Sequence, residues 1–364
     1  MLRRTKKDLY LHIGLGKTGT TSLQTFFWAN RNLLGKLGIL YPKYGAVAGA
    51  HHVLSPHVPP FLANVWKFIP VEEWAPEIYR QADRPVLLSS ELISSLKPEL
   101  VRGVAAVLQR YFSPKVIIYL RRQDHVMIAA YNQQVKAGTQ VLDIRSALGM
   151  LYKRFDYEDR IKPWMDAFGK DNLILRPYER GQLRDGDIRS DFLAGVLGIE
   201  DASKFETSNT NENPRFAYSA LEYKRAINNV VKDTQASTRF NEALLAYSAD
   251  VDQGSTAIFH ESDLLAGAER KMILNRARHL NTWIARDVMG RPDGILFKDP
   301  EPEEDPNWVE PSVGEDDFAE IGQVMKSRNF ARELMGHINQ SLKSDLFEGY
   351  RYARKLAHSI GEKI

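Results

Sequence analysis

Short apolar runs alternate with longer amphipathic stretches through the first half of the chain. The apolar runs predict buried strands at 9–13, 39–41, 85–89, 115–120 and 173–176. Between them, apolar positions at helical spacing predict helices at 20–36, 61–82, 98–111, 123–136 and 146–168. Strands that are apolar throughout and alternate with helices are typical of a parallel sheet covered on both faces. The sequence therefore predicts an α/β fold of three layers, α/β/α, with a central parallel sheet.

The pattern becomes mainly helical after about residue 190. Helices are predicted at 189–197, 215–232, 238–248 and 262–288. The segment 299–317 contains nine acidic residues, four prolines and neither lysine nor arginine, which is typical of a solvated linker. One or two amphipathic helices are predicted in 318–364, a candidate surface for packing against a second subunit. We therefore expect a main domain over 1–298 (α/β core at about 9–180, helical part at about 190–298), the linker 299–317, and the helical C-terminal segment 318–364.

Composition places the chain among ordinary globular proteins. Its 364 residues are 43% apolar and 26% charged, and a net charge of +3 is too small to indicate a nucleic-acid partner. The chain has no cysteine, which excludes disulfides and thiolate metal sites. No signal segment and no apolar run of membrane-spanning length is found, so we expect a cytoplasmic protein without a transmembrane segment.

A glycine-rich turn with one lysine follows the first predicted strand. It contains Gly14, Gly16, Lys17 and Gly19, and a helix is predicted to begin at the threonine pair 20–21. Backbone N–H groups of such a turn point at an anion, and the helix N-terminus adds the positive end of its dipole. The arrangement predicts a site for a phosphate or sulfate group, with Lys17 supplying a mobile positive charge.

The turn matches the dinucleotide-binding motif only in part. Its glycines spell G-x-G-x-x-G, but such a site also needs an acidic residue about 20 positions further on. The stretch 9–71 contains no aspartate or glutamate at all. It instead carries five cationic side chains that favour an anionic ligand, namely Lys17, Arg31, Lys36, Lys43 and Lys67.

The turn also matches part of the triphosphate-binding motif G-x-x-x-x-G-K-[ST]. Residues 16–18 supply its second half, but Leu11 stands where the first glycine belongs. Later strands are followed by Glu91 and Arg121, whereas phosphoryl transfer with magnesium needs acidic residues near the metal. A P-loop nucleotide kinase or NTPase is kept as an alternative.

The segment 17–21, KTGTT, resembles the phosphosulfate-binding loop of sulfotransferases, and the resemblance extends over 9–180. It implies a P-loop NTPase-like sulfotransferase fold and in-line transfer of a sulfuryl group from 3′-phosphoadenosine 5′-phosphosulfate (PAPS), without a metal, to a hydroxyl or amine. The product nucleotide is adenosine 3′,5′-bisphosphate. The implied enzyme is of soluble bacterial type, and its acceptor is a glycan, a lipid or a small molecule. Lys17 would support the sulfuryl group, and the 5′-phosphate would be held by Lys17, Thr18, Gly19, Thr20, Thr21 and Ser22.

The resemblance continues after the fourth predicted strand. Arg121 takes the position of the arginine that binds the 3′-phosphate in the family, and Tyr178 that of a tyrosine near the adenosine. The family's serine eight residues after the arginine is replaced by Ala129. Alternative donors are Arg122, Tyr131 and Asn132. Arg215 lies where some members close a loop over the nucleotide. Because Ala129 lacks a hydroxyl, an inactive nucleotide-binding module is a second alternative.

The resemblance also implies a histidine or glutamate that takes the acceptor's proton. The candidates are His51 and His52, after the second predicted strand, and Glu91, after the third. A histidine accepts a proton near neutral pH. The choice among the three stays open at this point.

The segment 51–79 carries further candidates. A metal site is not expected at His51, His52 and His57, because they lack both the i, i+4 spacing and the nearby acid of zinc hydrolases. Aromatic residues predicted to line either an acceptor cleft or the core are Phe61, Trp66, Phe68, Trp74 and Tyr79.

Overall fold

The computed structural model describes residues 5–56, 67–207, 216–252, 264–343 and 347–364. The chain divides into two compact units, each built from separated segments. The first contains residues 1–126, 155–210 and 274–300, and the second contains 127–154, 211–273 and 301–364. The helices α5 (Gln123–Lys136) and α12 (Gly267–Trp283) contribute residues to both.

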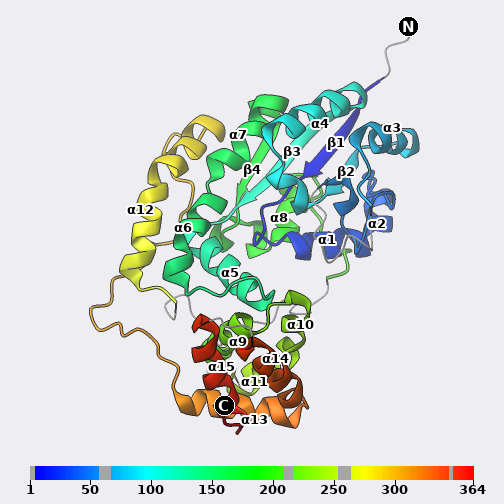
Figure 1. The fold of residues 1–364 in the computed structure, drawn as a ribbon. Coiled ribbons are helices and arrows are strands. Elements are labelled where there is room, and N and C mark those ends of the chain that lie inside the picture. The colour runs from blue at the N-terminus through cyan, green and yellow to red at the C-terminus, as the bar shows by residue number, and fades with distance from the viewer. Residues whose placement is uncertain (1–4, 57–66, 208–215, 253–263, 344–346) are drawn as a thin grey trace. The chain divides into compact units, whose positions relative to one another are not determined.

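The first unit is built on a parallel sheet of four strands in the order β2-β1-β3-β4 (Figure 1). Its strands are β1 (Lys7–His12), β2 (Val86–Ser89), β3 (Phe112–Leu120) and β4 (Leu173–Pro177). In the central register, Leu11 pairs with Leu88 on one side and with Val116 on the other. The predicted α/β class and parallel sheet are confirmed, and all four strands end at the same edge.

Helices cover both faces of this sheet. On one face, side chains of α1 (Thr20–Ala29), α2 (Arg31–Lys36) and α8 (Ile188–Gly195) form a buried cluster with the sheet residues Leu87, Ile117 and Tyr119. Helices α3 (Val71–Gln81), α4 (Pro98–Tyr111) and α7 (Tyr157–Phe168) pack together on the other face, where α4 and α7 contact β3. The result is the predicted three-layer arrangement.

Several predicted elements differ from those observed. Residues 67–70 of the predicted helix 61–82 are not helical, and the predicted helix 238–248 breaks at Phe240. The segment 39–41 forms only a single bridge, in which Leu40 pairs with Val86 at the β2 edge. The predicted helix 20–36 breaks at Asn30, whose side chain binds the backbone of Glu206 through both its amide nitrogen and its oxygen. The predicted helix 146–168 is two helices, because Asp156 caps α7 by accepting from the Glu158 N–H at 3.1 Å.

The second unit is helical, as the pattern after residue 190 predicted. Its core surrounds α9 (Tyr218–Val230), which packs against helices of the C-terminal segment. The remaining helices are α6 (Ile144–Arg154), α10 (Thr234–Arg239), α11 (Asn241–Asp252), α13 (Glu315–Ser327), α14 (Ala331–Leu342) and α15 (Phe347–Ser359). No helix of the described residues is long and apolar enough to cross a membrane.

The two parts of the acidic segment 299–317 differ in structure. Residues 301–314 form neither helix nor strand. Its last three acidic residues instead form the first turn of α13, where Asp317 accepts from the Gly314 N–H at 2.8 Å. Negative side chains stabilise a helix N-terminus, which explains why the helix begins inside the acidic run. The segment after it forms three helices, where one or two were predicted.

A buried lysine lies in the core of the second unit. Lys224, on α9, is 0% exposed, and its Nζ donates to both the carbonyl and the hydroxyl of Ser237, the latter at 2.5 Å. Burial disfavours the charged form and lowers the pKa of Lys224 to about 7.

The stability of the protein should therefore rise with pH above neutrality. An unfolded lysine keeps its proton to about pH 10.4, so between pH 7 and that value the unfolded state binds more protons than the folded state. We expect the free energy of unfolding to increase by on the order of 1–3 kcal/mol from pH 7 to pH 9.5. Urea unfolding at both pH values measures this rise, and Lys224→Met should remove most of it. The exposed Lys162→Met serves as the control, and an unchanged pH slope in Lys224→Met would contradict the assignment.

Candidate active site

The carboxyl ends of four parallel strands gather the predicted site residues at one edge of the first unit. The glycine-rich loop follows β1, Glu91 lies just beyond β2, Arg121 directly follows β3, and Tyr178 directly follows β4. In open α/β sheets this edge is where ligands bind. The arrangement follows from the parallel topology, because each strand delivers its next residue to the same side.

The loop between β1 and α1 is folded by three residues with left-handed backbone. Gly14, Lys17 and Gly19 have φ values of 39°, 71° and 74°. A Cβ on Gly14 would lie 2.3 Å from Cγ2 of Thr20, and one on Gly19 would lie 2.9 Å from Ile188. Both positions therefore require glycine, and the loop passes close to the start of α1.

The start of α1 offers donors to a ligand. The N-cap residue Gly19 supplies no capping side chain, and no acidic residue lies in the first turn. Thr20 is buried, Thr21 is exposed and Ser22 is half-buried. Thr18 is buried and donates its hydroxyl to the Leu15 carbonyl at 2.5 Å, so that hydroxyl closes the turn. Backbone N–H groups and the hydroxyls of the first turn make this end of α1 suitable for an anion.

Arg121 and Tyr178 meet this loop. The Arg121 guanidinium donates to the carbonyl of Lys17 at 3.2 Å and lies 5.8 Å from the centre of the Tyr178 ring. The Tyr178 ring also lies against Gly19, where an added Cβ would be 3.0 Å from it. Tyr157 donates its hydroxyl to the Arg121 carbonyl and so fixes the backbone after β3. The structure thus brings together residues that are 104 positions apart in the chain.

The guanidinium group of Arg122 is bound by other residues of the protein. It is buried, and its guanidinium binds both carboxylate oxygens of Asp124, the carbonyls of Asp299 and Pro300, and the ring of His125. These contacts argue against a role for Arg122 in binding a phosphate.

Tyr131 and Asn132, the further candidate donors to a 3′-phosphate, belong to the second unit, as does Ala129. The hydroxyl of Tyr131 donates to the Leu142 carbonyl in the same unit. Arg215 lies outside the described residues.

The two adjacent histidines differ in their surroundings. His51 is 0% exposed, its Nδ1 accepts from the Ser89 N–H at 3.2 Å, and its Nε2 donates to the Pro42 carbonyl at 2.9 Å. Burial lowers the pKa of His51 to about 4. With both ring nitrogens engaged, His51 holds the end of β2 against the segment after Leu40 and has no nitrogen to offer a substrate.

His52 and Glu91 form a pair at the same edge. His52 Nδ1 lies 3.0 Å from the Ser90 hydroxyl, and its Nε2 lies 3.9 Å from Glu91 Oε2. Their side chains are 14% and 27% exposed. Gln24 donates to the same Glu91 oxygen at 2.6 Å. Burial lowers the pKa of His52, while the Glu91 carboxylate acts in the opposite direction. Two of the three candidate bases are therefore neighbours.

Sequence reasoning missed His12, the last residue of β1. It is 0% exposed, and its Nδ1 lies 2.8 Å from the Ser89 hydroxyl. Among the described residues its Nε2 has no hydrogen-bond partner, and burial lowers the pKa of His12 to about 3. A neutral imidazole here ties the end of β1 to the end of β2. A polar residue inside the apolar run 9–13 is the signal that could have found it.

Of the described candidate aromatic residues, Trp74 belongs to the core and Tyr79 is half-buried. Trp74 is 3% exposed, and Tyr79 packs on Phe112 with ring centres 5.8 Å apart. Phe68 is exposed, whereas Phe61, Trp66 and His57 lie outside the described residues. Within the described part of the chain, no three His, Cys, Asp or Glu side chains are grouped to hold a metal ion.

Comparison with known proteins gives limited similarity. No family model matches the sequence. A curated protein of Archaeoglobus fulgidus, described as uncharacterized, is 27% identical over 187 residues, which are 51% of this chain and 49% of that protein. The chain thus spans about half the length of this relative. The crystal structure of a sulfotransferase from Alicyclobacillus acidocaldarius aligns with a TM-score of 0.39 and 19% identity, over 57% of this chain and 87% of that chain. Similarity at this level assigns no function, so the assignment must come from the site itself.

Gly16 and Gly19, on either side of Lys17 and Thr18, allow a test of the loop geometry. Gly19→Ala places a Cβ at positive φ and against Ile188, so we expect a loss of about 1–3 kcal/mol in the free energy of unfolding. Gly16→Ala is the matched control, because a Cβ there meets no atom within 4 Å. Chemical denaturation measures both variants. Equal stability of the two would show that the loop does not have this conformation.

Proposed function

We propose that the protein is a sulfotransferase that moves a sulfuryl group from PAPS to a hydroxyl or amine of an acceptor. The observation that carries this proposal is the meeting of Lys17, Arg121 and Tyr178 at one anion-binding loop. Two cations from different strand ends and an aromatic ring suit a nucleotide with phosphates on both sides of its ribose. The cytoplasm is the compartment we propose for it.

The chemistry of the loop suits the donor's 5′-phosphosulfate. Gly14 and Gly19 lack the Cβ atoms that would fill the turn, and α1 begins without a capping side chain. In this proposal, the N–H groups of residues 18–22 and the hydroxyls of Thr20, Thr21 and Ser22 bind the 5′-phosphate. Arg121 binds the 3′-phosphate, and Tyr178 lies beside the adenosine. The bound donor supplies the activated sulfuryl group.

Side chains of the protein then stabilise the charge on the departing phosphate and take the acceptor's proton. Lys17 places its ammonium group where negative charge grows on the departing phosphate. His52 donates Nδ1–H to the Ser90 hydroxyl, which leaves the lone pair on Nε2 to take the acceptor's proton. The new Nε2–H then faces the Glu91 carboxylate, which stabilises the imidazolium. His12 and His51 hold the strand end that carries Ser90.

Ligand preference distinguishes a sulfotransferase from a kinase and from an inactive module. We expect adenosine 3′,5′-bisphosphate to bind at least about tenfold more tightly than ATP with magnesium in calorimetry, because Arg121 matches a 3′-phosphate. Lys17→Ala should abolish transfer from labelled donor to an acceptor found by screening. The control is the exposed Lys170→Ala. A preference for ATP with magnesium would favour the kinase or NTPase, and bisphosphate binding without transfer to any acceptor would favour the inactive module.

The pH dependence of turnover tests the base. Because the pKa of His52 lies below its ordinary value of 6.5, kcat/KM should be flat above that pH and fall as His52 is protonated at lower pH. Glu91→Gln removes the charge that raises this pKa, so the fall should move to lower pH, with activity retained in part. His52→Gln should cost about 10²–10⁴ in kcat. If Glu91→Gln instead abolishes activity while His52→Gln retains it, Glu91 is the base.

A further inference from the structure

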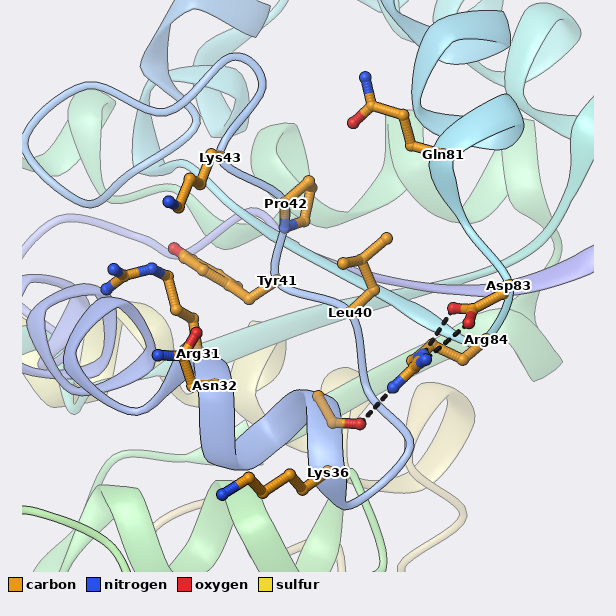
Figure 2. A pocket seen from close by; sticks show the side chains of 11 residues that line it. Arg31, Asn32, Lys36, Leu40, Tyr41, Pro42, Lys43, Gln81, Asp83 and Arg84 are labelled. Carbon is orange, nitrogen blue, oxygen red and sulfur yellow. Dashed lines mark hydrogen bonds and ion pairs between the residues drawn. The ribbon is translucent and has the colours of Figure 1, made fainter.

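A cationic cavity lies at the β2 edge of the sheet, formed by residues other than those of the proposed donor site. It has a volume of about 600 Å³. Its walls come from α2, from the segment 40–43 and from residues 81–84, which precede β2 (Figure 2). Neither the loop 14–20 nor Arg121 nor Tyr178 contributes to its lining. Its ligand can therefore differ from the donor nucleotide.

Positive charge dominates the lining. The described lining residues include a single carboxylate, that of Asp83, and four cationic side chains, those of Arg31, Lys36, Lys43 and Arg84. Asp83 is already bound by Arg84, with Nε and Oδ1 2.5 Å apart (Figure 2). The ammonium groups of Lys36 and Lys43 form no hydrogen bond or ion pair with any described residue. A concave surface with several cations and one paired acid attracts anions.

Arg31 is held in place at this wall. Its Nη1 donates to the Trp28 carbonyl at 2.7 Å, and its guanidinium lies 4.7 Å from the centre of the Trp28 ring. Stacking of this kind fixes the orientation of a guanidinium. Arg31 forms no ion pair with a described residue, so its charge adds to that of the two lysines.

One wall of the cavity adjoins the proposed base. Tyr41 and Pro42 line the cavity, and both contact His51: the Tyr41 and His51 ring centres are 4.7 Å apart, and the Pro42 carbonyl accepts from His51 Nε2. The next residue is His52, which faces Glu91. The buried side chain of His51 thus lies between the cavity wall and the catalytic edge.

We propose that this cavity binds the anionic part of the acceptor, and that the acceptor is an acidic oligosaccharide. The inference rests on the proposed function. Arg84 precedes β2 and Glu91 follows it, and a strand of four residues spans about 13 Å, so a ligand that reaches both must be extended. Guanidinium groups together with the amides of Asn32 and Gln81 suit carboxylates and hydroxyls.

Binding of defined trimers tests this assignment. The probes are trigalacturonate, the neutral maltotriose and the acidic peptide triglutamate, each titrated into the full chain by calorimetry. We expect trigalacturonate to bind at least about tenfold more tightly than the other two. Replacing both Lys36 and Lys43 with glutamine should weaken its binding about tenfold, and more at low salt. The double replacement of Lys162 and Lys170 with glutamine, both exposed and outside the cavity, is the charge-matched control.

Adenosine 3′,5′-bisphosphate separates this inference from the proposed function. The double variant should bind it as the unchanged protein does, since neither lysine belongs to the donor site. Loss of trigalacturonate binding with bisphosphate binding intact supports the cavity as the acceptor site. Equal binding of trigalacturonate to the double variant, equal binding of triglutamate, or no binding of trigalacturonate overturns it. If only adenosine 3′,5′-bisphosphate fails to bind, the donor assignment is wrong. The trigalacturonate titrations then still decide whether the cavity binds the acidic oligosaccharide.

Discussion

The parallel pairing of β1 with both β2 and β3 is the constraint on which the site depends. Leu11 lies opposite Leu88 and Val116, so the residues after His12, Ser89 and Leu120 emerge side by side. The contact between Arg121 and the Lys17 carbonyl, and the link between His12 and Ser89, exist only in this register. A slip by one residue would reverse the face of every side chain in the strand and separate the loop from its arginine.

Cationic side chains of the stretch 9–71 lie both in the loop and at the cavity. The stretch 9–71 has no acidic residue, so its cations are not cancelled locally. Lys17 serves the loop, while Arg31, Lys36 and Lys43 line the cavity beside β2. The acidic residue nearest to the reaction in our proposal, Glu91, comes from beyond β2 and pairs with His52. In our proposal, the cations bind two anionic substrates, PAPS and the acidic acceptor, while the Glu91 carboxylate lies beside His52, which takes the acceptor's proton.

Local patterns predicted the parts of the site that depend on a few neighbouring residues. The spacing of Gly14, Lys17 and Gly19 identified the loop, and the resemblance to sulfotransferases pointed to Arg121 and Tyr178, which the structure brings to that loop. The sequence could not separate His51 from His52, because their difference arises from distant partners, Pro42 and Ser90. The break at Asn30 depends on the backbone of residue 206 in the same way. The run 39–41 is too short for its pattern to distinguish a strand from a single bridge.

The central claim is that the loop after β1 and the arginine after β3 hold the two ends of one nucleotide. A crystal structure of the protein with adenosine 3′,5′-bisphosphate tests this most directly. The account predicts the 5′-phosphate within hydrogen-bond distance of the N–H groups of residues 18–21, and the 3′-phosphate beside Arg121. A nucleotide bound elsewhere, or one with its 3′-phosphate away from Arg121, would contradict it.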